Sequence, residues 1–121
     1  MHAKFLQQQL DDTRFLLQQI AASGGTIGYR ELAQLIEINQ SPVIAQTCEI
    51  LEKLMQEDVS NKLPIVAAVV VQKGDEKIPR KGFFEELQNL TVLPTDISWN
   101  EARTWHQNER KKLQHYYEEN T

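Results

Sequence analysis

The sequence predicts an α+β domain in which three helices are followed by a β-hairpin and a long C-terminal helix. Apolar residues recur at three- and four-residue spacing in the first half of the chain and again near its end, as they do on helices. Between these segments, residues 64–72 form a short run rich in β-branched side chains, which is typical of a strand. The 121 residues are enough for one hydrophobic core, so we expect a single domain over residues 1–121.

Two helices separated by a glycine turn are expected first. In residues 4–22, Leu10 and Leu17 belong to one apolar stripe among glutamines. Residues 24–25 are glycines, which supply the positive φ angles that end a helix, and residues 26–27 then make a short extended step. The second helix is expected in "YRELAQLIEI", and its inner face holds Leu32, Leu35 and Ile36.

A third helix is predicted from Ser41 to about Asp58. Ser41 has the side chain of an N-cap, and Pro42 suits the first helical position because its missing N–H needs no partner there. The expected inner face consists of Val43, Thr47, Ile50, Leu51 and Leu54. The expected outer face is acidic through Glu49, Glu52, Glu57 and Asp58.

The second half of the chain begins with the predicted hairpin. Residues 64–72 form its first strand, residues 73–77 its polar tip, and residues 78–79 begin an edge strand. A short helix is then expected over 83–90. Ser98 and Glu101 form a capping box, which starts a long final helix. The apolar face of that helix holds Trp99, Ala102, Trp105 or His106, Leu113, Tyr116 and Tyr117.

This element order is that of a winged-helix domain, in which the third helix and the hairpin, or wing, face the same partner. The N-terminal helix then occupies residues 1–25, the helix-turn-helix and wing 26–90, and the C-terminal helix 91–121.

Composition narrows the class of protein. The formal net charge is -4, which argues against a surface built as a whole to coat nucleic acid but allows a local basic patch. Cys48 is the only cysteine, so no intramolecular disulfide can form and a reducing compartment, the cytoplasm, is expected. The longest apolar run, 65–71, is too short to cross a bilayer, so no membrane association is expected.

Two segments resemble known proteins. "TIGYRELAQLI" resembles the "TYGELA" segment of the alkyltransferase and alkyltransferase-like DNA-repair proteins, and "LPIVAAVVVQKGDEKIPRKGF" stands in the place of their "PCHRVV" strand. A closer resemblance, over residues 26–87, is to small bacterial and phage proteins of unassigned function with "YxELA" followed by "LPxLxxLVVNKxTGxPGxGF". The matching residues are Tyr29, Glu31, Leu32, Ala33, Leu63, Pro64, Val69 to Val71, Lys73, Pro79, Gly82 and Phe83. The resemblance implies a helix-turn-helix and a mobile-element or host-defence setting.

The departures from the alkyltransferase pattern limit what the resemblance implies. Alkyl transfer needs a reactive thiolate directly after the proline, whereas Pro64 is followed by Ile65, Val66 and Ala67. Cys48 lies in the predicted third helix and is expected to be a small buried thiol. His106 and His115 are nine residues apart, which does not suit a metal pair on adjacent helical turns. We therefore expect no enzyme, no cofactor and no metal site.

The predicted wing carries the candidate functional residues. Four cations lie within nine positions around two acids, and they could bind phosphates on a chain that is otherwise negative. Polar side chains at the start of the third helix could approach a phosphate or a base edge. The expected nucleic-acid-binding residues are Gln40, Ser41, Gln46, Lys73, Lys77, Arg80 and Lys81.

Two functions remain open. The first is a non-catalytic winged-helix protein that binds double-stranded DNA through these residues. The second is a protein interaction module, which docks on a partner or a second copy through the acidic third helix or through an exposed aromatic stripe of the C-terminal helix, Trp105, Tyr116 and Tyr117. The basic wing favours the first function and the acidic helix the second.

Overall fold

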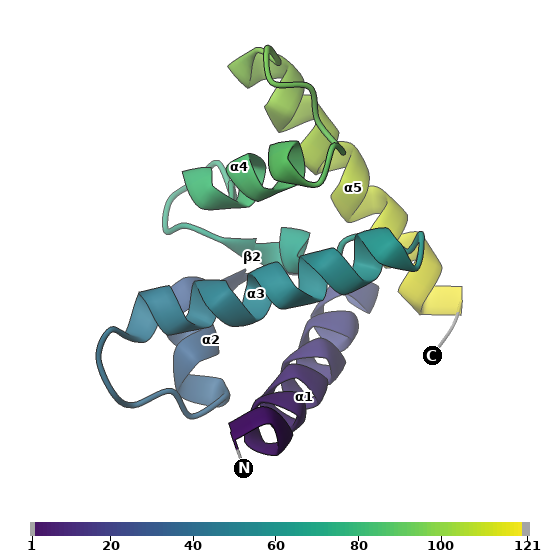
Figure 1. Ribbon diagram of the computed structural model, residues 1–121. Helices are drawn as coiled ribbons and strands as arrows, with labels where there is room; N and C mark the ends of the chain where they lie inside the picture. The colour runs from purple at the N-terminus through teal and green to yellow at the C-terminus, as the bar shows by residue number, and fades with distance from the viewer. Residues whose placement is uncertain (1, 120–121) are drawn as a thin grey trace.

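The computed structural model describes the backbone of residues 2–119 and the side chains of residues 7–119. Within that range the chain is mostly helical, with five α-helices and one small sheet of two strands, in agreement with the α+β class (Figure 1). The elements are α1 (His2–Ala22), β1 (Ile27–Gly28), α2 (Tyr29–Leu35), α3 (Val43–Ser60), the 3₁₀ helix η1 (Val66–Val69), β2 (Val70–Val71), α4 (Lys81–Asn89) and α5 (Trp99–Glu119). No helix in this range is long and apolar enough to cross a membrane.

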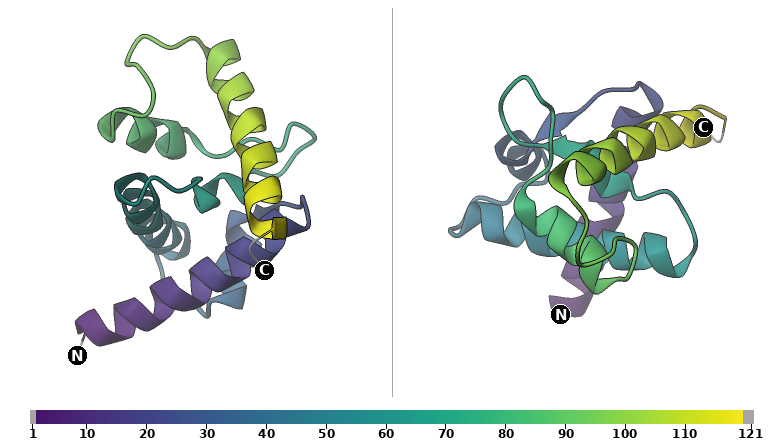
Figure 2. Two further views of the ribbon diagram at one scale, coloured as in Figure 1. Left: turned by 90° about the vertical axis from the view of Figure 1, so that its right-hand side faces the viewer. Right: turned by 90° about the horizontal axis from the view of Figure 1, so that it is seen from above.

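The helices surround a short central segment made of η1 and β2. In Figure 1, α3 lies in front of β2 with α4 above it and α1 below it. Helix α1 packs against α5, and both helices together with α3 contact η1 (Figure 2). The side chains of η1 and β2 are therefore buried on all sides, and leucines from each α-helix close the core around them. The largest fully buried ones include Leu17, Leu32, Leu54, Leu87 and Leu113.

The predicted β-hairpin is wrong. Residues 66–69 are a 3₁₀ helix, and only Val70–Val71 form a strand. This strand pairs in parallel with β1, with Ile27 opposite Val70 and Gly28 opposite Val71. Residues 72–80 make a loop whose tip, 72–77, is exposed while Ile78 and Pro79 are buried; it is closed by hydrogen bonds from the Gln72 N–H to the Ile78 carbonyl at 2.8 Å and from the Gln72 side-chain amide to the Pro79 carbonyl at 3.3 Å. The wing of the sequence-based prediction is thus a loop at the end of a parallel strand.

Polar side chains explain why a run of β-branched residues becomes a 3₁₀ turn. The Val66 N–H donates to Asp58 Oδ2 at 3.0 Å, and the Ile65 N–H donates to Glu109 Oε2 at 2.7 Å. His106 Nε2 donates to the Ala68 carbonyl at 2.8 Å. All three side chains are buried, and they satisfy backbone groups that would otherwise lose water without a partner. The 3₁₀ turn therefore depends on helix residues that are distant in sequence.

The sequence places most helix boundaries correctly within two residues. Gly24 has a φ of 77° at the end of α1, as expected for a helix-ending glycine. The capping box of α5 is confirmed, because Ser98 Oγ accepts from the Glu101 N–H at 3.1 Å and Glu101 accepts from the Ser98 N–H at 3.0 Å. At α3 the N-cap is Pro42 rather than Ser41, and the Ser41–Pro42 peptide is cis.

Two other predictions about side-chain burial are wrong. Leu35 is predicted on the inner face of α2, yet it is 57% exposed at the last position of that helix, and Ile36 and Ile38 after it are buried instead. Asp58 was expected on the outer face of α3, yet it is fully buried against η1. Burial raises the pKa of Asp58, although the Val66 amide and the Arg14 guanidinium oppose this effect.

Candidate nucleic-acid interface

The loop 72–80 is fixed at its far end by Tyr29, the first residue of α2. The Tyr29 hydroxyl accepts a hydrogen bond from the Arg80 N–H at 2.9 Å, and the Arg80 guanidinium carbon lies 5.8 Å from the centre of the Tyr29 ring. Burial raises the pKa of Tyr29 to about 12, so the phenol stays neutral. Tyr29 thereby joins the loop to α2, and the two segments together border a groove.

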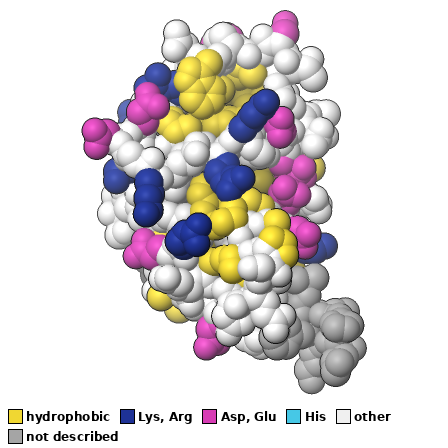
Figure 3. Space-filling model, turned by 90° about the vertical axis from the view of Figure 1, so that its left-hand side faces the viewer, with side chains coloured by type: hydrophobic (Ala, Val, Ile, Leu, Met, Phe, Trp, Pro, Cys, Tyr) yellow, Lys and Arg dark blue, Asp and Glu magenta, His cyan; other side chains and the backbone are white. Residues whose placement is uncertain are grey.

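This basic groove is a hollow of about 640 Å³ between the start of α2, the first turn of α3 and loop 72–80. Its lining includes Gly28 and Tyr29 at the base, Ile44 on the α3 side, and the cations Arg30, Lys73, Lys77 and Arg80. Glu31 is the acidic residue in the lining. The face of the molecule that carries the loop shows Lys and Arg side chains gathered around hydrophobic patches (Figure 3).

The cations of the basic groove are free to bind a ligand. Within the described residues, Arg30, Lys73 and Lys77 make no ion pair or hydrogen bond through their side chains, and all three are exposed. Arg80 is also exposed, its guanidinium lies over the Tyr29 ring, and it has no ion pair among the described residues. Uncompensated cations on both sides of one groove create a positive potential that favours an anionic ligand.

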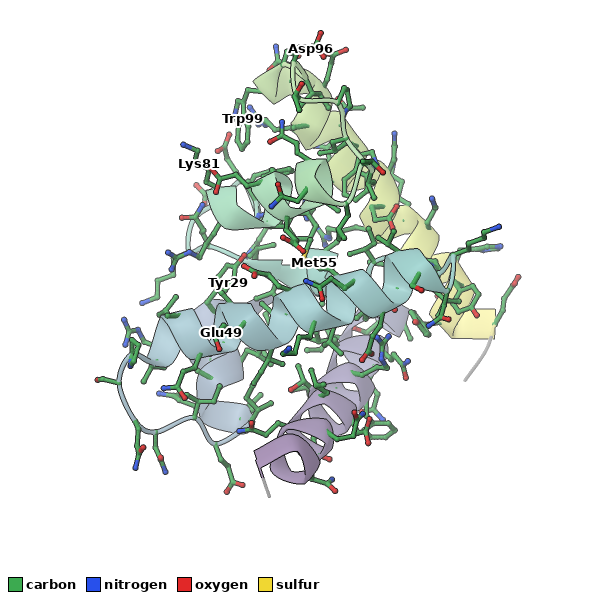
Figure 4. The ribbon with its side chains drawn as sticks, viewed as in Figure 1. Tyr29, Glu49, Met55, Lys81, Asp96 and Trp99 are labelled. Carbon is green, nitrogen blue, oxygen red and sulfur yellow. The ribbon has the colours of Figure 1, made fainter. Side chains whose placement is uncertain are left out.

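A second groove, of about 570 Å³, lies on the other side of Arg80 between α3 and α4. Its base is apolar through Met55 and Phe83, and its walls carry Glu49, Glu52 and Glu85. Figure 4 shows Glu49 and Met55 on α3 and Lys81 at the start of α4. Burial raises the pKa of Glu52, and the neighbouring Glu86 and Glu49 raise it further. This acidic groove would repel the phosphates that the basic groove attracts.

Cys48 lines the acidic groove and is half-buried rather than fully buried as the sequence predicts. Burial raises the pKa of its thiol, an effect that Arg80 opposes. A thiol with a raised pKa is a poor nucleophile, because the thiolate is the reactive form. Within the described residues no three His, Cys, Asp or Glu side chains are grouped so that they could hold a metal ion.

The structure brings together only part of the predicted set of binding residues. Lys73, Lys77 and Arg80 line the basic groove, whereas Lys81 lines the acidic groove and forms a loose ion pair with Glu85 at 3.8 Å. Gln40 and Ser41 are exposed in the turn before α3 but lie outside both grooves.

Gln46 also lies outside both grooves, and its side chain is already engaged. Its amide nitrogen donates to the Gln40 carbonyl at 2.6 Å and lies 3.3 Å from the Pro42 carbonyl. The side chain therefore braces the turn before α3, and only its oxygen remains available to a ligand.

Sequence reasoning missed Arg30 and Tyr29 as members of the groove. The available signal was their position directly after the short extended step at 26–27, because the residue that follows a strand lies at the edge of the sheet. The partner of that strand, β2, leads straight into loop 72–80, so the parallel pairing places Arg30 opposite Lys73 and Lys77 across the groove.

The acidic face expected on α3 is smaller than predicted. Asp58 is buried, and Glu57 is bound by Arg14 at 3.0 Å. Glu49 and Glu52 remain near the surface, and both line the acidic groove rather than the basic one. Comparison with protein-family models, with curated proteins and with solved structures finds no match for this chain.

Proposed function

We propose that the protein binds double-stranded DNA without catalysis, through the basic groove. The observation that carries this proposal is the convergence of Arg30, Lys73 and Lys77, which have no ion-pair partner within the described residues, on one groove with Arg80. The phosphate backbone supplies most of the affinity of non-specific DNA binding, and lysine and arginine side chains that neutralise it release bound counterions.

In this proposal the domain acts in the manner of a winged helix. Helices α2 and α3 pack against each other and take the part of the helix-turn-helix, while loop 72–80 takes the part of the wing. Arg30, Lys73 and Lys77 contact phosphates from both sides of the groove. Gln40 and Ser41 are exposed in the turn before α3, whose first turn lines the groove through Ile44, and in this proposal they are the candidates to reach a base edge.

The acidic groove sets the direction of binding. Because Glu49, Glu52 and Glu85 lie on the far side of Arg80, a duplex that follows α3 toward its C-terminus would meet negative charge. A duplex that lies across the first turn of α3 and over loop 72–80 avoids it.

The test is fluorescence anisotropy of a labelled duplex over a series of salt concentrations. We expect affinity to fall steeply with salt, and the double variant Lys73→Glu/Lys77→Glu to reduce the slope by about two. A matched control is Lys53→Glu/Lys111→Glu, which changes the net charge equally at two exposed lysines outside the basic groove. Equal losses in both variants would show that only overall charge matters and would remove the groove from the proposal.

A protein interaction module is the second candidate. The aromatic residues of α5 give it little support, since Tyr117 is buried and Trp105 packs against Phe83 with ring centres 6.2 Å apart. The large apolar side chains that are most exposed are Phe15 on α1 (62%) and Leu35 on α2 (57%), while on α5 Trp99 is 51% exposed at the first position of the helix. An absence of duplex binding even at low salt, together with loss of self-association or partner capture in Phe15→Ser, would favour this second function.

A further inference from the structure

A hollow on the opposite side of loop 72–80 from the basic groove contains an exposed tryptophan. It has a volume of about 490 Å³ and is lined by the loop, by Lys81 and by Trp99. Half of Trp99 is exposed (51%), although it is the first residue of α5 and a large apolar side chain. We call this feature the Trp99 hollow.

The indole of Trp99 packs against the Phe84 ring. Its ring meets the Phe84 ring edge-on, with centres 5.4 Å apart and planes at 77°. Phe84 is itself buried and packs against Phe83 at 5.3 Å. Such a contact fixes the orientation of the indole and leaves aromatic surface open to solvent. An exposed, oriented indole is suited to stacking.

The charges around the hollow are mainly positive. Lys73, Lys77 and Lys81 line it together with Asp75 and Glu76. Arg103 pairs with Glu76 at 2.8 Å and Lys81 pairs loosely with Glu85 at 3.8 Å, so within the described residues Lys73 and Lys77 are the lysines of the hollow without an ion pair. Figure 4 shows Lys81 and Trp99 along the same edge of the molecule, at the starts of α4 and α5. An aromatic surface bordered by lysines is the arrangement by which proteins bind single-stranded nucleic acid, with bases stacked and phosphates neutralised.

Loop 72–80 connects this hollow with the basic groove. Lys73 and Lys77 line both, one on each side of the same loop. A strand that leaves a duplex in the basic groove can therefore cross the loop and reach Trp99 while its phosphates stay near these two lysines.

We propose that Trp99 stacks on an unpaired base in a single-stranded segment that continues from the bound duplex. The preferred ligand is then a duplex with an unpaired flank, rather than a blunt duplex. This inference rests on the proposed function, because the duplex part of the ligand occupies the basic groove.

The first test compares the affinity of a blunt duplex with that of the same duplex carrying an overhang of about six nucleotides, on either strand end. We expect the overhang to bind about tenfold more tightly, as one stacked base does in single-strand binding proteins. Equal affinity of the blunt and overhang duplexes would overturn the inference and leave the proposed function intact. Absence of binding to either DNA would overturn both.

Two variants separate stacking from folding. Trp99→Leu keeps an apolar side chain against Phe84 but removes the aromatic surface, so the ratio of overhang to blunt affinity should fall to about one. Trp99→Phe keeps an aromatic ring and should retain part of the ratio. A ratio that is unchanged in Trp99→Leu would overturn the inference, and thermal unfolding of each variant shows whether the fold is kept.

Tryptophan fluorescence provides an independent readout. Trp105 is half-buried against Phe83, so it serves as an internal control. In Trp105→Phe, where Trp99 remains as the fluorophore, the overhang duplex should quench emission more than the blunt duplex does. In Trp99→Phe the two ligands should have equal effects. Quenching that does not depend on Trp99 would place the unpaired base elsewhere.

Discussion

Two consecutive segments of the chain, residues 65–69 and loop 72–80, differ in how they are held. The first is buried and is hydrogen-bonded by three helix side chains: Asp58 and Glu109 accept from its amides, and His106 donates to its Ala68 carbonyl. The second is exposed and is held by the Gln72–Ile78 bond and the Tyr29 hydroxyl. The two segments therefore differ in role. Buried polar side chains around residues 65–69 stabilise the fold, whereas the lysines of loop 72–80 stay available to a ligand.

The largest expected effect is that of Asp58→Ala. The change removes the acceptor of the Val66 amide and the 2.6 Å partner of Arg14, which is left with Glu57 at 3.0 Å and the Leu54 carbonyl at 3.5 Å. Breaking such a buried pair costs about 3 kcal/mol in the free energy of unfolding. Asp75→Ala in the exposed loop is the matched control and should stay within about 0.5 kcal/mol of the parent. Urea unfolding measures both, and equal effects would abolish the distinction between the two segments.

A smaller loss in the free energy of unfolding is expected on acidification, through protonation of His106. Burial lowers the pKa of His106 below its ordinary value, the Ala68 carbonyl opposes this, and Arg110 adds to it. Since the unfolded chain then binds the proton more readily, stability is complete above the unfolded pKa of about 6.5 and is lost as pH falls below it, by at most about 1.4 kcal/mol per pH unit.

The measurement is the urea midpoint between about pH 7.5 and about pH 5.5. The slope should disappear in His106→Gln and persist in His115→Gln, because His115 is exposed. A slope that survives in His106→Gln would assign the acid sensitivity to another group.

The smallest effect is expected from Tyr29→Phe. This change removes only the hydroxyl that accepts the Arg80 N–H, and such a hydrogen bond contributes about 1 kcal/mol to stability. Loop 72–80 should become more mobile, so amide hydrogen exchange at residues 73–80 should accelerate while exchange at residues 65–69 stays unchanged. Faster exchange in both segments would mean that Tyr29 supports the whole domain rather than the loop.

The sequence predicts the helices well because their information is local. The apolar spacing of α1 and α3, the glycines after α1 and the capping box at Ser98 each lie within a few residues of the boundary that they define. Helix α3 begins later than predicted because its N-cap is Pro42 and not Ser41.

The strand predicted at residues 64–72 is wrong because of hydrogen bonds to a side chain that is distant in sequence. The β-branched side chains there favour a strand, but the acceptor that binds the Ile65 amide, Glu109, lies far along the chain. A signal was nevertheless present. Asp58 follows Leu51 and Leu54 at seven and four residues, and Glu109 lies between His106 and Leu113 at three and four residues. A carboxylate on the inner face of a helix must find a buried donor, and here the donors are backbone amides of the apolar run.

The candidate site was predicted only in part, because only those of its residues that lie close together in sequence could be recognised. The cations of loop 72–80 lie within a few positions of one another, so Lys73, Lys77 and Arg80 were correctly predicted to lie together. Arg30 reaches the same groove only through the parallel pairing of β1 with β2, which no local pattern indicates.

The parallel pairing of β1 with β2 also bears on the order in which the chain folds. Ile27 pairs with Val70 across more than forty intervening residues, and we expect such a non-local contact to form late in folding because loop closure must precede it. The two walls of the basic groove therefore come from segments that we expect to come into contact late in folding. A chain in which β1 and β2 are not paired therefore has Arg30 apart from Lys73 and Lys77, and we expect it to lack the basic groove of the folded protein.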